Sequence, residues 1–256
     1  MAVQRKVVST AKGDDEQEVE VLEEQEDIVD EKLVDDSVQW IRETLAKTLA
    51  TDMAAGGTYD SAIAQVIKAA DATTSVAVMS YQFFTGKTPT TAGMDYLIAP
   101  DGPNANNLNS AYYQYFDYGN RYINFAMNLG KVGEGATAFA ASYGALTLAD
   151  ATRKAYAAIF GLSPTDQKLH DLLDASFVLN GQTMTRADYF AYYGQDGLNG
   201  QGTKAAMVGW LLGEAAKADV GVYAKSLAAF YADELTREVF GVDLIGSYAK
   251  PEYNLT

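Results

Sequence analysis

The chain has 256 residues, a formal net charge of -15, and 48% hydrophobic and 11% aromatic residues. This composition is typical of a globular protein, and no stretch reaches the roughly 18 uninterrupted apolar residues of a membrane span, so we expect no membrane insertion. The absence of cysteine excludes disulfides, thiolate metal sites and cysteine nucleophiles.

The negative charge is concentrated near the N-terminus. Thirteen acidic residues and a single lysine lie between Asp14 and Asp36, whereas the rest of the chain is close to neutral. Burial cannot offset the ordering of so dense a charge, so residues 1–36 are predicted to be a disordered acidic tail, which either solubilises the chain or docks to a partner. Without a basic surplus, nucleic-acid binding is not expected. The first ten residues lack the apolar core of a secretory signal peptide.

Helix signals begin after this tail. Asp36 or Ser37 can cap a first helix that ends at Gly56-Gly57, and two further helices are expected over 60–70 and 74–84. A short helix is predicted over 91–98. A loop of turn-forming residues over 100–107 then precedes a long aromatic helix over 108–129.

The second half of the chain is also predicted to be helical. Helices are expected over 136–143 and 148–160, and another starts at Ser163-Pro164. Thr185 and Asp188 resemble a capping box, residues 207–212 are apolar all round, and a long amphipathic helix is expected over 220–240. We find no sustained period-two alternation between hairpin turns. The prediction is an all-α fold of about ten helices, with one compact domain over 37–247 and a C-terminal tail over 248–256.

Several blocks of sequence carry a resemblance to a known family. Residues 73–86 read TTSVAVMSYQFFTG and residues 120–129 read NRYINFAMNL, with further blocks at 92–97, 107–113, 135–143, 205–209 and 221–224. In these blocks the chain resembles the N-terminal, lipopolysaccharide-anchoring domain of caulobacter-type surface-layer (S-layer) proteins. The resemblance covers about residues 58–240. It implies a helical, non-enzymatic module that binds the O-antigen polysaccharide of lipopolysaccharide at the outer-membrane surface, with calcium (Ca²⁺) supporting the assembly.

The sequence departs from that family pattern in three ways. The acidic tail replaces the usual start, the long repetitive lattice-forming region is missing, and no C-terminal secretion signal is recognisable after Tyr248. One alternative is therefore a structural phage virion protein that uses such a domain to attach to the host surface. A second is a glycan hydrolase, although no pair of carboxylates stands out by context. Whether the chain forms a homo-oligomer stays open.

Two aromatic clusters are candidate glycan-binding sites. Sugars present apolar C–H faces and hydroxyl rims, which suit aromatic rings flanked by amides and a guanidinium. The first cluster lies on the predicted 108–129 helix and comprises Tyr112, Tyr113, Tyr115, Tyr118, Asn120, Arg121 and Asn124. The second comprises Tyr189, Tyr192 and Tyr193. For each tyrosine the alternative is a core position with its hydroxyl satisfied at the edge.

The loop over 100–107 is a candidate calcium site. Asp101, Asn104 and Asn106 place oxygen ligands close together, as Ca²⁺ requires. The spacing does not match an EF-hand, and a turn rich in Asx residues explains the same pattern. The single histidine, His170, cannot form a two-histidine metal site, so we interpret it as structural.

Overall fold

The computed structural model describes residues 45–100, 102–179, 181–236 and 243–255. The acidic segment over 1–36 and the predicted start of the first helix lie outside these residues. The helical segment over 45–54 agrees with the later part of that first helix, which ends before Gly56.

Helix α2 (Tyr59–Thr85) is one continuous helix, so the prediction of two helices over 60–70 and 74–84 was wrong. It begins with a capping box, in which Thr58 Oγ1 accepts a hydrogen bond from the Ser61 amide at 3.1 Å, and it ends at Gly86 in a left-handed conformation. No glycine or proline interrupts it. The Ser75 hydroxyl donates to the Asp71 carbonyl inside the helix, a local bond that leaves the helix intact.

The predicted aromatic helix over 108–129 was also wrong as a single element. It is divided into α4 (Ala111–Gln114), α5 (Tyr118–Met127) and a π-helical turn, η1 (Asn128–Val132). The division occurs because Asp117 caps a new helix, its carboxylate accepting a hydrogen bond from the Asn120 amide at 2.9 Å. The preceding helix α3 (Thr91–Ile98) has the predicted bounds.

The remaining predicted helices are present. They are α6 (Ala136–Tyr143), α7 (Leu148–Phe160), α8 (Asp166–Leu173), α9 (Arg186–Gly194), α10 (Gln201–Ala218) and α11 (Gly221–Thr236). Threonine side chains cap the starts of α7, α8 and α9. Residues 237–240 of the predicted last helix lie outside the described residues. The all-α prediction is therefore confirmed.

One small sheet was missed. Strands β1 (Ser176–Leu179) and β2 (Gln182–Thr185) form an antiparallel hairpin in which Leu179 pairs with Gln182. The dipeptide Asn180-Gly181 at the turn is a known hairpin signal, and Gly181 has φ +79°. The four-residue strands are too short for a convincing alternation, and the apolar Val178 faces solvent with 67% of its surface exposed.

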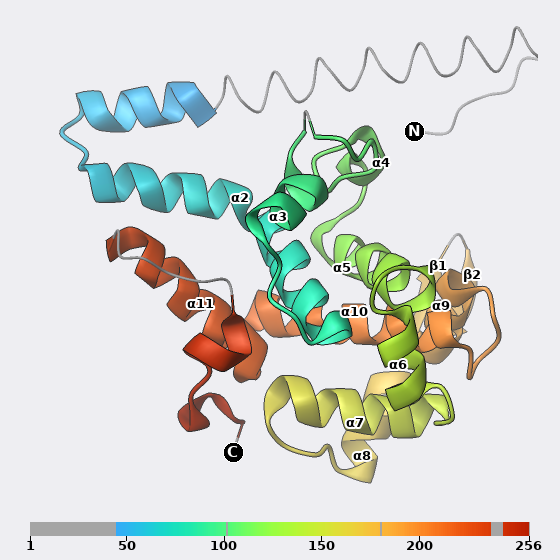
Figure 1. Ribbon diagram of the computed structural model, residues 1–256. Helices are drawn as coiled ribbons and strands as arrows, with labels where there is room; N and C mark the ends of the chain where they lie inside the picture. The colour runs from blue at the N-terminus through green and yellow to red at the C-terminus, as the bar shows by residue number, and fades with distance from the viewer. Residues whose placement is uncertain (1–44, 101, 180, 237–242, 256) are drawn as a thin grey trace, which may run out of the picture. The chain divides into compact units, whose positions relative to one another are not determined.

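Helix α10 is the central element of the core. Buried residues occupy every side of it, as its apolar sequence predicts, and it packs against α5, α7 and α9 (Figure 1). Near the C-terminus, the turns η2 (Leu244–Tyr248) and η3 (Pro251–Tyr253) precede Leu255, whose amide donates to the Phe160 carbonyl of α7 at 2.8 Å. None of the described helices has the length and apolarity of a transmembrane span.

Candidate functional site

A pocket of about 200 Å³ lies where α5, the β1–β2 hairpin, α9 and α10 meet. We name it the Asn120 pocket, after the residue that joins the two aromatic clusters predicted from the sequence. It combines three aromatic rings with amide, carboxylate, guanidinium and ammonium groups. Its lining consists of Asp117, Gly119, Asn120, Ile123, Phe177, Arg186, Tyr189, Trp210 and Lys217.

Asn120 holds the polar side of the pocket together. Its Oδ1 accepts hydrogen bonds from the hydroxyls of Tyr189 at 2.7 Å and Tyr193 at 3.3 Å. Its Nδ2 donates to Asp117 Oδ2 at 2.9 Å. An amide group has two N–H donors, so the second one is available to a ligand, as are the lone pairs of the two tyrosine hydroxyls.

Aromatic rings form the apolar side of the pocket. Phe177 and Tyr189 meet edge to face with ring centres 5.1 Å apart, and Tyr189 meets Tyr193 in the same way at 5.0 Å. Next to them, Tyr192 is 60% exposed and packs edge to face on Tyr193. Burial is the main cause of the raised pKa of Tyr189, so its hydroxyl stays protonated and able to donate.

Arg186 is fixed on the ring of Trp210, with its guanidinium carbon 4.4 Å from the ring centre. Its Nη1 donates to the Leu172 carbonyl at 2.7 Å and to the Asp171 carbonyl at 3.3 Å, at the end of α8. Desolvation lowers the pKa of this guanidinium, which nevertheless stays charged. Arg186 therefore connects the start of α9 to α8 and α10, and keeps further N–H groups for a ligand.

The charges of the pocket nearly balance. Lys217 pairs with Glu214 at 3.0 Å, and its Nζ lies over Gly119, where a Cβ atom would be only 3.0 Å away. The carboxylate of Asp117 accepts hydrogen bonds from the backbone amide and the side-chain amide of Asn120. A pocket of this kind suits a neutral, polyhydroxylated ligand better than a strongly charged one.

The chain matches the model of one protein family, described as the RsaA N-terminal domain, over residues 73–256. This is the N-terminal domain of S-layer proteins of the Caulobacter type. The chain belongs to this family. No curated protein matches the chain. The family is of a structural, non-enzymatic kind, and an S-layer domain implies a cell-surface or extracellular location.

Of the first aromatic cluster, only Asn120 lines the Asn120 pocket of the S-layer domain. Tyr113 is 1% exposed, and Asn124 is also buried, where its Oδ1 accepts a hydrogen bond from the Tyr112 hydroxyl at 3.2 Å. Arg121 donates to the carbonyls of Phe116 and Leu108, both at 3.2 Å, so it supports the loop before α5. In their observed positions Tyr113 and Asn124 cannot contact a ligand.

Two other tyrosines of that cluster point elsewhere. Tyr115 is 76% exposed, outside the lining of the Asn120 pocket. Tyr118 lines a different groove, in which its hydroxyl donates to the carboxylate of Asp71 at 3.4 Å. A single continuous helix over 108–129 would have carried all these side chains. Because a new helix, α5, begins after Asp117, they lie on separate elements.

The predicted calcium loop is held by its own hydrogen bonds. Asn104 Oδ1 accepts from the Asn106 amide at 3.0 Å, and Asn104 Nδ2 donates to the Tyr96 carbonyl at 3.1 Å. Asp101 lies outside the described residues. In the part of the chain that the structure describes, no group of three or more His, Cys, Asp or Glu side chains could hold a metal ion. Calcium binding by this loop stays a prediction.

Sequence reasoning missed seven of the nine residues that line the pocket, among them Phe177, Arg186 and Trp210. The Asn180-Gly181 signal would have predicted a hairpin, with Phe177 on its first strand and Arg186 directly after its second. Trp210 had no local signal, because it lies in the segment 207–212, which is apolar all round. Only the packing of α10 against α5 and α9 identifies the side of that helix which reaches the pocket.

Proposed function

We propose that this S-layer domain is a non-enzymatic module that binds the O-antigen polysaccharide of lipopolysaccharide, and that the Asn120 pocket with the adjoining Tyr192 ring is its glycan-binding surface. The observation that supports this most directly is that Asn120, from the first predicted cluster, accepts hydrogen bonds from Tyr189 and Tyr193 of the second.

The chemistry of the pocket fits a sugar ring. The rings of Phe177 and Tyr192 offer surfaces on which apolar C–H faces can stack. Around them, the remaining N–H of Asn120 and the tyrosine hydroxyls can exchange hydrogen bonds with sugar hydroxyls. A volume of about 200 Å³ is small, so we expect one sugar unit in the pocket, with neighbouring units running across Tyr192.

The test is co-sedimentation of the full chain with outer-membrane vesicles. Vesicles that carry complete lipopolysaccharide are compared with vesicles that lack O-antigen, and purified O-antigen serves as the competitor. We expect binding only to the complete vesicles, and its loss when competitor is added. Equal binding to both kinds of vesicle would overturn the proposal.

Variants locate the surface. Tyr192→Ala removes an exposed ring and is expected to weaken binding about tenfold, and Asn120→Ala is expected to weaken it further because both tyrosine hydroxyls lose their acceptor. Tyr96→Ala is the matched control, since Tyr96 is 51% exposed on α3 and does not line the pocket. If Tyr96→Ala weakens binding and Tyr192→Ala does not, the glycan surface lies elsewhere.

Location is tested separately. Antibody labelling of intact cells is expected at the outer surface. Labelling confined to phage particles would instead favour the virion alternative, in which the same domain attaches a particle to its host.

A further inference from the structure

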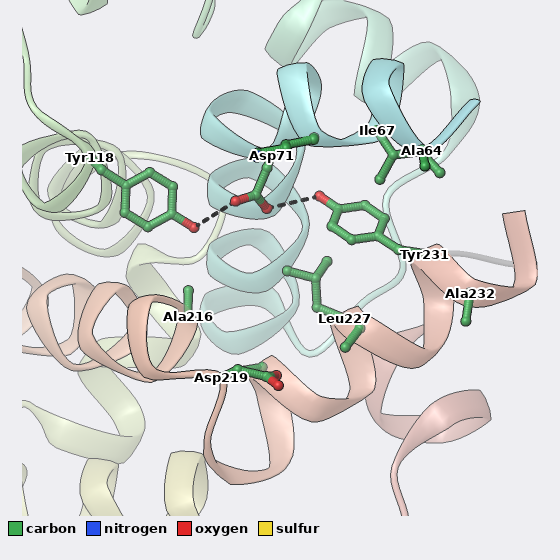
Figure 2. A pocket seen from close by; sticks show the side chains of 12 residues that line it. Ala64, Ile67, Asp71, Tyr118, Ala216, Asp219, Leu227, Tyr231 and Ala232 are labelled. Carbon is green, nitrogen blue, oxygen red and sulfur yellow. Dashed lines mark hydrogen bonds between the residues drawn. The ribbon is translucent and has the colours of Figure 1, made fainter. Parts of the chain in front are cut away.

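A second concavity, of about 430 Å³, lies between the first half of α2, the end of α10 and α11 (Figure 2). We name it the Asp71 groove. Its walls are mainly apolar and are made by five alanines together with Ile67 and Leu227. It does not share a lining residue with the Asn120 pocket.

The groove is open because its side chains are too short to close it. Protein interiors are normally packed as densely as organic crystals, and alanines on facing helices leave a gap unless the helices approach closely. On α2 the apolar stripe remains partly uncovered, with Ile67 half-buried and Val66 46% exposed. The described residues therefore leave an apolar surface that a ligand can cover.

A carboxylate lies in this apolar setting. Figure 2 shows Asp71 between two tyrosines from different elements, with the Tyr118 hydroxyl 3.4 Å from Oδ2 and the Tyr231 hydroxyl 3.3 Å from Oδ1. Both distances are long for O–H···O⁻ hydrogen bonds, which are normally about 2.5–2.7 Å. The two hydroxyls consequently orient the carboxylate without satisfying it.

No cation neutralises Asp71 among the residues that the structure describes. The other carboxylate of the groove, Asp219, pairs with Lys225 at 2.5 Å. Lys68 lies exposed on α2, and it forms no ion pair with Asp71 within the described part of the chain. A half-buried carboxylate beside apolar walls is stabilised by a cation that enters with it.

We propose that the Asp71 groove binds a primary aliphatic ammonium, a ligand with one positive charge on a short apolar chain. The ammonium group donates to the carboxylate of Asp71, between the rings of Tyr118 and Tyr231, which also attract a cation. The alkyl chain lies along Ile67, Leu227 and the alanines. Lys68 at the rim repels a second positive charge, so the groove selects monoamines over diamines.

The experiment is a titration of the full chain with n-butylammonium chloride, followed by NMR. Butanol and sodium butyrate are the matched neutral and anionic probes of similar length. We expect saturable shifts of α2 and α11 signals with butylammonium, and at least tenfold weaker binding of butanol and butyrate. Butanol binding as tight as that of butylammonium, or no saturable shifts, would overturn the proposal.

Three variants separate the charge from the shape of the groove. Asp71→Asn keeps the size of the side chain and is expected to weaken the binding of butylammonium at least tenfold. Lys68→Ala is expected to strengthen this binding. Ala228→Trp fills the groove at an exposed position and is expected to abolish binding. Its control is Ala158→Trp, at an exposed position on α7 outside the groove.

The outcomes are distinct from those of the glycan test, since both Trp variants leave the Asn120 pocket unchanged. Unaltered butylammonium binding in a folded Asp71→Asn protein would overturn the role of the carboxylate. If circular dichroism shows that Asp71→Asn does not fold, the comparison of Ala228→Trp with Ala158→Trp and that of butylammonium with butanol decide the question. Binding that survives Ala228→Trp would place the ligand elsewhere.

Discussion

Replacing Gly209 with alanine would place a methyl group in the contact between α10 and α5. The new Cβ atom would lie 2.7 Å from the Ala126 Cβ and 2.9 Å from the Ile123 Cα, and it would also meet the carbonyl oxygen of Tyr122. Ordinary contacts of a Cβ atom begin at 3.4 Å. Two of the three atoms belong to the backbone of α5, so relief requires movement of a helix and not of a flexible side chain.

The expected cost follows from this geometry. Overpacking of a close-packed core costs about 1–3 kcal/mol, and a clash with backbone belongs at the upper end, about 3 kcal/mol. The better helix propensity of alanine offsets about 1 kcal/mol. We therefore expect the free energy of unfolding to fall by about 2 kcal/mol. For a domain of this size, that lowers the melting temperature by roughly 4–8 °C.

The assay is urea unfolding followed by circular dichroism and tryptophan fluorescence. The control is Gly213→Ala, one turn later on α10, where the new Cβ would lie 3.3 Å from the Tyr122 ring and 3.5 Å from its Cβ. For that variant, the small shift of the ring and the gain in helix propensity nearly cancel, so we expect little change. A Gly209→Ala protein as stable as the parent would refute the close contact between α5 and α10.

Two further predictions concern local interactions. Thr185→Ala removes the hydroxyl that accepts from the Asp188 amide at 3.1 Å and should cost about 1 kcal/mol in urea unfolding, whereas Thr183→Ala on the exposed strand should cost less. Asp174→Asn should lower the pKa of His170, because the Asp174 carboxylate, 2.6 Å from Nδ1, is the main cause of its raised value. Since the pKa is raised in the folded state, the stabilisation is present below the ordinary histidine pKa and is lost as pH rises through the raised one. An NMR titration of His170 checks this, with Asp171→Asn as the control; an unchanged pKa in Asp174→Asn would contradict the assignment.

Helix starts were the most predictable features, because a cap is a bond between residues three positions apart. Thr185 and Asp188 could be recognised from the sequence, and the structure contains both reciprocal hydrogen bonds of that capping box. Asp117 uses the same kind of bond, yet it lies inside an apolar, aromatic pattern that continues through it. The helical periodicity hid the cap, and the long helix was therefore predicted in error.

The roles of individual tyrosines could not be predicted in the same way. Tyr112 and Tyr113 are adjacent and chemically identical, but Tyr112 is half-exposed and Tyr113 is buried. Their difference depends on α4 being a single short turn whose orientation is set by contacts outside it. For each tyrosine of the cluster the sequence allowed both a binding position and a core position, and only the structure distinguishes them.

The sequence by itself determined the helical class, the bounds of α3, α6 and α7, and the family, because periodicity, caps and family motifs are properties of short stretches of chain. The Asn120 pocket and the Asp71 groove were decided by tertiary structure. Asn120 meets Tyr189 from 69 positions away, and Asp71 meets Tyr231 from 160 positions away. Contacts at such separations exist only after α10 and α11 have packed against the earlier helices, and no local pattern encodes the angle at which they do so.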